Sequence, residues 1–86
     1  EHREIAILQR ELSNQEVIVR VAAIHALGSA SSKDQYTINL LIEELSDSKE
    51  VIREAAANAL WQIGTPDAYA AYVSFVENIS KNFASE

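Results

Sequence analysis

The sequence predicts an all-α fold, an α-solenoid in which antiparallel helix pairs stack on one another. The first observation is an internal repeat with an offset of 33 residues, the separation of Arg20 and Arg53. The same offset places the Ala-Leu pair at 26–27 on the Ala-Leu pair at 59–60. The second observation is that apolar residues recur at helical spacing within each copy, between short polar segments. A repeat of this period is typical of a solenoid, whose units bury their apolar faces only against neighbouring units.

The first helix is predicted over residues 4–13. Its apolar side chains recur at i, i+3 and i+7, which places them on one helical face. They are Ile5, Leu8 and Leu12. The helix is expected to stop at Ser13-Asn14, where a short polar side chain can accept a hydrogen bond from the free amides of the next helix. Either residue is therefore a candidate N-cap.

The second helix is predicted over residues 16–28. One side of it carries small residues, which allow a neighbouring helix to approach closely. Gly28 favours the end of this helix. The polar residues 29–34 then have an ordinary length for a connection between helices. The two helices together make a first unit at about residues 4–31.

The second unit, at about residues 35–64, repeats this plan. Its third helix has an apolar face made by Ile38, Leu41, Ile42 and Leu45. After a turn at 46–48, a fourth helix is predicted over about 49–63. Asp47 is expected to cap this helix better than Asn14 caps the second, because its charge also favours the positive end of the helix macrodipole. Gly64 is the expected C-cap, and Thr65 or Asp67 can cap the helix that follows.

A half unit is predicted over residues 67–83. Its fifth helix, at 67–81, has an apolar face made by Ala68, Ala71, Tyr72, Phe75, Val76 and Ile79. The helix occupies the first-helix position of a third unit, so the chain holds about two and a half units. The chain begins at Glu1 inside a helical pattern. We therefore expect residues 1–86 to be a single repeat domain cut from a longer protein, with repeat ends that can self-associate.

Composition limits the class of protein. With 86 residues, 48% hydrophobic and 23% charged, the chain is expected to form one domain. No apolar run approaches the roughly 18 residues of a membrane span, and the amino end lacks the features of a signal peptide. A soluble, cytoplasmic protein is expected. There are no cysteines, which excludes a disulfide scaffold and a thiolate metal site.

The charge balance argues against nucleic acid as a partner. There are 13 acidic and 7 basic side chains, for a formal net charge of -6, and the basic ones are scattered. Binding to a phosphate backbone needs clustered Lys and Arg. An acidic chain instead favours a protein partner with a basic or mixed face.

Both copies resemble HEAT-like repeats, particularly the short bacterial kind described in phycobilisome lyase subunits. In that family a unit has an apolar first helix, an Asp-containing turn, a Val-Arg pair, small residues and Ala-Leu-Gly. The matching residues are Leu45, Asp47, Ile52-Arg53, Ala56 and Ala59-Leu60 in one copy, and Leu12, Val19-Arg20, Ala23 and Ala26-Leu27-Gly28 in the other. Asn14 departs from the usual acidic turn residue, and Trp61 stands where the first copy has Gly28.

The resemblance implies a structural ladder in which the turn Asp and the helix Arg hydrogen-bond along the stack. Asp47, Arg20 and Arg53 would take these roles. Their positions agree, because each Arg lies at the flank of its apolar stripe, where its stem can pack and its guanidinium can reach an oxygen. Asn14 is neutral, so the ladder of the first copy is expected to be weaker.

The resemblance also implies that the second helix of each unit lines a concave face. On a helical wheel, residues opposite or beside the apolar stripe are expected to form a partner-binding strip on that face. They are Val21, Ile24, His25, Glu54, Asn58 and Trp61. Trp is enriched among interface hot spots. The alternative for Trp61 is that it folds over the 64–67 loop or covers the fifth helix. His25 has no second ligand at a usable spacing and is interpreted as a surface residue.

No catalytic, cofactor-binding or metal-binding constellation is predicted. Neither histidine is followed by Glu, and Glu43-Glu44 lie about 100° apart on a helix, so they do not converge as an acid and base pair. They are interpreted as solvated charges. The predicted function is a non-catalytic interaction or scaffold module for another protein or peptide. The resemblance implies one alternative, a fragment of a phycobilin lyase or a chaperone-like protein for a tetrapyrrole-binding protein.

Overall fold

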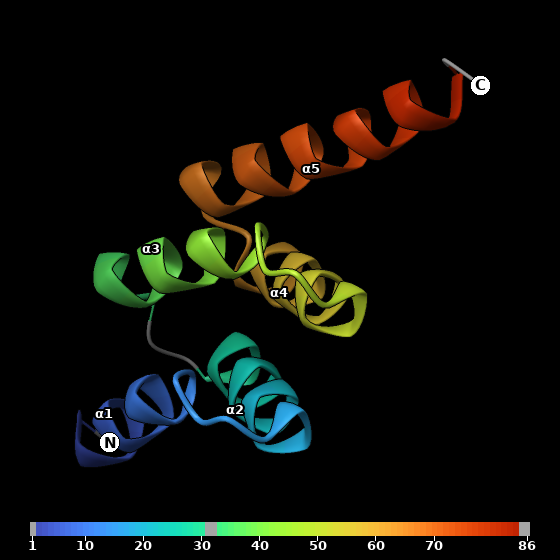
Figure 1. Cartoon of the computed structure of the whole chain (residues 1–86). Helices are drawn as coiled ribbons and strands as arrows, with labels where there is room; N and C mark the ends of the chain where they lie inside the picture. The colour runs from blue at the N-terminus through green and yellow to red at the C-terminus, as the bar shows by residue number, and fades with distance from the viewer. Residues whose placement is uncertain (1, 31–32, 85–86) are drawn as a thin grey trace.

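The computed structural model describes residues 2–30 and 33–84. These residues form the helices α1 (His2–Glu11), α2 (Val17–Ser29), α3 (Gln35–Glu44), α4 (Glu50–Ile63) and α5 (Pro66–Ala84) (Figure 1). The described ranges contain no β-strand, so the predicted all-α fold is confirmed. Within them, none of the helices combines the length and the apolar character that a membrane span needs. The predicted end of the first unit, near residue 31, lies outside the described residues.

The helices pack in pairs that stack along one direction. α1 contacts α2, α3 contacts α4, and α4 also contacts α2. Figure 1 shows the α1–α2 pair, the α3–α4 pair and α5 at successive levels from the N-terminus to the C-terminus. The molecule measures 45 × 29 × 15 Å along its principal axes, so the stack is elongated and thin. This is the α-solenoid arrangement that the repeat predicts.

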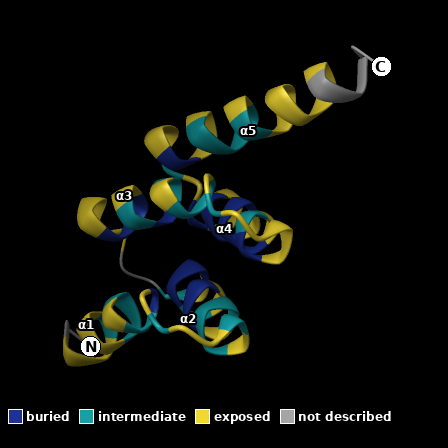
Figure 2. Ribbon diagram, in the orientation of Figure 1, coloured by how far each residue is buried: buried dark blue, intermediate teal, exposed yellow. Residues whose placement is uncertain are grey.

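The core lies mainly where α2, α3 and α4 meet. Figure 2 shows the buried residues concentrated on these helices. The largest fully buried side chains are Ile24, Leu27, Ile38, Leu41, Ile52 and Leu60. Burying one such side chain contributes about 1.5–3 kcal/mol to folding. The two apolar stripes of the repeat thus pack against each other rather than forming separate cores.

Gly28 does not end the second helix, contrary to expectation. α2 continues through Ser29, and Gly28 is buried inside it. A Cβ atom at Gly28 would lie 2.8 Å from both the Cα and the Cβ of Ala59. Gly28 therefore marks a close approach of α2 and α4. Gly64 does end α4, with the left-handed φ of 71° that favours glycine at a C-cap.

The turn residues Asn14 and Asp47 do not cap the helices that follow. The N-cap positions are Glu16 and Lys49, and neither side chain makes a capping hydrogen bond. Instead, the Asn14 Oδ1 accepts from the Glu16 amide at 2.8 Å, and the Asp47 Oδ2 accepts from the Lys49 amide at 2.9 Å. Each side chain therefore bonds the amide of the N-cap residue and stabilises the turn before the helix. Asn and Asp commonly form this turn by accepting from the amide two residues further along.

The start of α5 follows the predicted capping. Thr65 precedes Pro66, the first residue of the helix, and its Oγ1 accepts from the Ala68 amide at 3.3 Å. Proline suits this first position because its missing amide hydrogen would have no partner there. Of the two candidates, Thr65 is the cap, and Asp67 lies inside the first turn, where its charge favours the helix dipole.

Candidate protein-binding surface

The inter-unit ion pairs centre on Arg20 of α2. Its Nη2 donates to the Glu44 Oε1 at 2.8 Å and to the Asp47 Oδ1 at 2.6 Å, and all three side chains are partly buried. The bonds to Asp47 and then to Glu44 raise the pKa of Arg20 above its ordinary value. The bond from Arg20, followed by that from the Lys49 amide, lowers the pKa of the Asp47 carboxyl. One guanidinium thus joins the first unit to the second.

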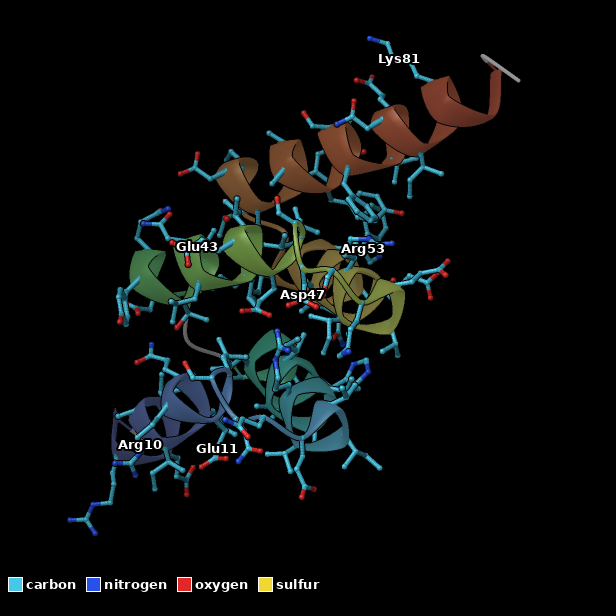
Figure 3. All side chains as sticks on the ribbon, viewed as in Figure 1. Arg10, Glu11, Glu43, Asp47, Arg53 and Lys81 are labelled. Atoms are coloured by element: carbon cyan, nitrogen blue, oxygen red, sulfur yellow. The ribbon has the colours of Figure 1, made fainter. Side chains whose placement is uncertain are left out.

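Glu44 corrects the interpretation of Glu43-Glu44 as two solvated charges. Glu43 is exposed on α3 (Figure 3). Glu44 is partly buried and paired with Arg20. The two side chains lie on different faces of the helix, and only one of them faces α2. Sequence spacing could not identify this contact, because the partner is 24 residues upstream.

Arg53 makes a different contact from that of Arg20. Its Nη1 donates to the backbone carbonyl of Asp47 at 2.7 Å, within its own unit (Figure 3). Asp47 is therefore held by Arg20 through its carboxylate and by Arg53 through its carbonyl. In the first unit the Nδ2 of Asn14 instead donates to the Glu11 Oε1 at 3.0 Å, a contact with the preceding helix.

Most of the predicted strip is accessible. His25, Glu54, Asn58 and Trp61 are exposed, and Val21 is half-buried against the core. Ile24 is an exception, since it is 0% exposed and belongs to the core. Ala57, its equivalent in the second unit, is buried as well. Ile24 belongs to the core cluster, and Ala57 lies beside Tyr72 and Val76 of α5. The buried stripe of each second helix is therefore wider than the helical wheel indicates, and it includes this position.

On the second helices, two exposed apolar residues were missed by the sequence interpretation. Ile18 is 76% exposed and Val51 is 49% exposed. They stand at equivalent repeat positions, and each lies on one helical face with two strip residues at i+3 and i+7. We call this surface the second-helix ridge: Ile18, Val21 and His25 of α2, with Val51, Glu54 and Asn58 of α4. The 33-residue offset combined with the i, i+3, i+7 spacing was the signal that could have revealed it.

Trp61 belongs to an aromatic cluster at the join of α4 and α5. Its ring centroid lies 5.6 Å from that of Tyr69 and 5.2 Å from that of Tyr72, with tilted planes. Such offset pairs stabilise beyond their buried area. Trp61 nevertheless remains 54% exposed. It therefore covers the beginning of α5 with one part of its ring and presents the rest to solvent.

A groove runs between α4 and α5. One part of it, of about 450 Å³, is lined by the apolar Leu45, Phe75 and Ile79 and by polar residues that include Glu50 and Glu54. A second part, of about 230 Å³, also touches Glu54 and Phe75 and extends to Asn58, Tyr72 and Val76. We call the two parts together the α4–α5 groove. It adjoins the second-helix ridge, because Glu54 and Asn58 belong to both.

The described residues show no group of three or more His, Cys, Asp or Glu side chains placed to hold a metal ion. What the surface offers is apolar contact, two exposed carboxylates on α4 and an exposed histidine on α2. Such a surface can recognise another macromolecule by shape and charge.

These features define an α-solenoid repeat protein: the helix pairs stack, the second helices share a core, and an arginine bridges the units. The family model for HEAT repeats matches residues 5–77. This chain therefore belongs to the HEAT repeat family, which confirms the HEAT-like character of its repeat residues. No curated protein and no solved structure matches it.

Proposed function

We propose that this chain is a non-catalytic module that binds a partner protein through the second-helix ridge and the exposed part of Trp61. The observation that carries the proposal is the repeated exposure of Ile18 and Val51, which solvation alone does not favour. Helical repeat arrays commonly use such extended surfaces to bind proteins. The acidic character of the chain favours a partner with a basic or mixed face.

The proposed role of Arg20, Asp47 and Arg53 is structural. Their hydrogen bonds hold the turn before α4 against both α2 and α4, and so keep the two second helices at a set spacing. A ridge made by two helices needs this spacing, because residues on both must meet the partner at once. We also propose that the chain forms one repeat domain of about two and a half units, with α5 in the first-helix position of the third.

The test is capture of a partner from an extract of the source cell, followed by affinity measurement with the purified partner. The baits are the natural chain, Ile18→Glu, Val51→Glu and Trp61→Ala. Tyr36→Glu is the matched control, since Tyr36 is exposed on α3, away from the ridge. We expect the two ridge variants and Trp61→Ala to weaken binding by about tenfold or more, as loss of about 1.4 kcal/mol predicts, and the control to leave it unchanged.

Two results would contradict the proposal. If all variants retain the same partner with the same Kd, the ridge does not carry binding. If the captured material shows the visible absorption of a bilin, the alternative function in tetrapyrrole attachment gains support instead. Circular dichroism of each variant checks that the helical fold persists.

A further inference from the structure

The α4–α5 groove has an apolar floor and an acidic rim. Ile79 is 40% exposed and Phe75 is half-buried, while Glu50 and Glu54 are exposed along the α4 side. The cation in the same lining is Arg53, whose Nη1 donates to the Asp47 carbonyl at 2.7 Å. That acceptor is neutral, so Arg53 keeps its positive charge. The two carboxylates of Glu50 and Glu54 outnumber it, and the α4 side of the groove carries a net negative charge.

The packing of α3 indicates which kind of secondary structure can cover an apolar helix face of this type. Its apolar residues at i, i+3, i+4 and i+7 are Ile38, Leu41, Ile42 and Leu45, and α4 packs against α3. α5 has the same spacing in Tyr72, Phe75, Val76 and Ile79. α4, the helix that packs on α3, buries small residues that include Ala55 and Ala56. The equivalent face of α5 is thus suited to an α-helix with an apolar stripe.

The charges decide which helix fits. A second copy of this chain would bring its own net charge of -6 and its own acidic rim to the contact, and like charges oppose association. A helix with Lys or Arg beside its apolar stripe would instead place cations near Glu50 and Glu54. These two carboxylates are four residues apart on α4, one helical turn, so cations one turn apart on the ligand match them.

We propose that the α4–α5 groove binds an amphipathic α-helix of a partner protein, with the apolar stripe of the ligand on the Phe75–Ile79 floor and its Lys or Arg residues on the Glu50–Glu54 rim. This is recognition of a helix in a groove. The inference rests on the proposed function, because it names the chemical class of partner that the ridge and the groove receive together.

The test uses a fluorescein-labelled, amidated peptide of Leu, Ala and Lys, about 18 residues long because shorter isolated helices are marginal. Leu and Ala stand at i, i+3, i+4 and i+7, and Lys flanks them. One control peptide has Glu for every Lys, and another has the same composition in scrambled order. Fluorescence anisotropy with the full chain gives the Kd. We expect saturable binding of one Lys peptide per chain, weakened by salt, and at least about tenfold weaker binding of both controls.

Matched variants locate the site. Ile79→Arg puts a cation on the floor of the groove, and Ile7→Arg does the same on α1, where Ile7 is 43% exposed. We expect the first to weaken peptide binding about tenfold or more and the second to leave it within about twofold. The double variant E50Q/E54Q should weaken binding and flatten its salt dependence, whereas E43Q, on the exposed side of α3, should not.

Equal effects of Ile79→Arg and Ile7→Arg, or equal binding of the scrambled peptide, would overturn the proposal in favour of unspecific charge attraction. Dimerisation of the chain that Ile79→Arg abolishes and the peptide does not inhibit would make a second copy the occupant, which also overturns it. If a captured partner depends on Ile18 while the groove binds no peptide, only the inference about the groove fails. If neither surface binds, the proposed function fails as well.

Discussion

The contact between α2 and α4 and the contact between α4 and α5 are built differently. In the first, Gly28 lets the backbones approach, and a Cβ there would meet Ala59 at 2.8 Å. In the second, the equivalent position is Trp61, whose ring packs on Tyr69 and Tyr72. The small residue allows a close contact between the two helices, whereas the large one reaches α5 through its ring. The groove along the second contact is lined by other residues, among them Phe75 and Ile79.

The ionic contacts differ in the same way. Arg20 reaches forward to Glu44 and Asp47 of the following unit. Arg53, at the equivalent position, bonds the carbonyl of Asp47 in the turn before its own helix. α3 ends at Glu44 and is followed by a turn. α5 instead continues unbroken from Pro66 to Ala84 and has no turn at the equivalent position. The first contact is therefore expected to carry most of the stability, and the second to be the more adaptable.

The largest expected effect comes from the core of the first contact. Leu27→Ala removes a fully buried side chain between the units and should lower the free energy of unfolding by about 2–5 kcal/mol. Ile18→Ala, on the same helix but exposed, should change it by less than about 0.5 kcal/mol. Urea denaturation followed by circular dichroism measures both. Equal losses would show that the α2–α4 contact is not the main source of stability.

Gly28→Ala should have the next largest effect. Alanine is about 1 kcal/mol better than glycine in a helix interior, but its Cβ would meet the Ala59 backbone, and overpacking of this kind costs about 1–3 kcal/mol. We expect a net loss of stability in thermal unfolding. Ser29→Ala, at the exposed next position, is the control and should be neutral or slightly stabilising. If Gly28→Ala is instead more stable than the natural chain, α2 and α4 can move apart at this contact with little loss of free energy.

The arginine pair tests the ionic difference. Arg20→Ala removes two charge-assisted hydrogen bonds to partly buried carboxylates, and we expect a loss of about 1–2 kcal/mol after allowing for solvent screening. Arg53→Ala removes one bond to a carbonyl and should cost about half as much. Paired urea titrations compare the two variants. A larger loss for Arg53→Ala would reverse the proposed order of the two contacts.

The smallest expected effect is in the pH dependence. The pKa of Asp47 is lowered in the folded chain, so its carboxylate contributes stability that is fully present above its unfolded pKa of about 3.9 and is lost as pH falls through the folded value. The stability difference between the natural chain and Asp47→Asn should therefore shrink below about pH 4. Unfolding curves from neutral to acid pH measure this difference. A gap that stays constant would show that the carboxylate charge does not matter.

The sequence predicted the architecture because the repeat is encoded in local features. Apolar spacing, the Gly64 C-cap and Thr65 before Pro66 each act within a few residues, and all three are found where they were expected. The family followed from the Val-Arg and Ala-Leu positions. Local signals of this kind need no knowledge of how the units pack.

The errors concern positions whose role depends on a neighbouring unit. Ile24 was placed on the strip, but it is fully buried in the core between the helices. Gly28 was interpreted as a helix end, although it serves the approach of Ala59. Glu44 was interpreted as solvated, but it meets an arginine from the preceding unit. A helical wheel assigns faces within one helix, and it cannot show how wide a stripe a second packed helix will bury.

The Gly28–Ala59 contact also has a consequence for protein engineering. A synthetic array made by joining copies of residues 35–67, one full 33-residue repeat, would bring Trp61 of one copy to the position that Gly28 occupies here. An indole cannot fit where even a methyl group would clash. Such a concatemer would need Trp61→Gly at every internal junction to reproduce the observed spacing, with the tryptophan retained only in the copy whose last helix is left uncovered.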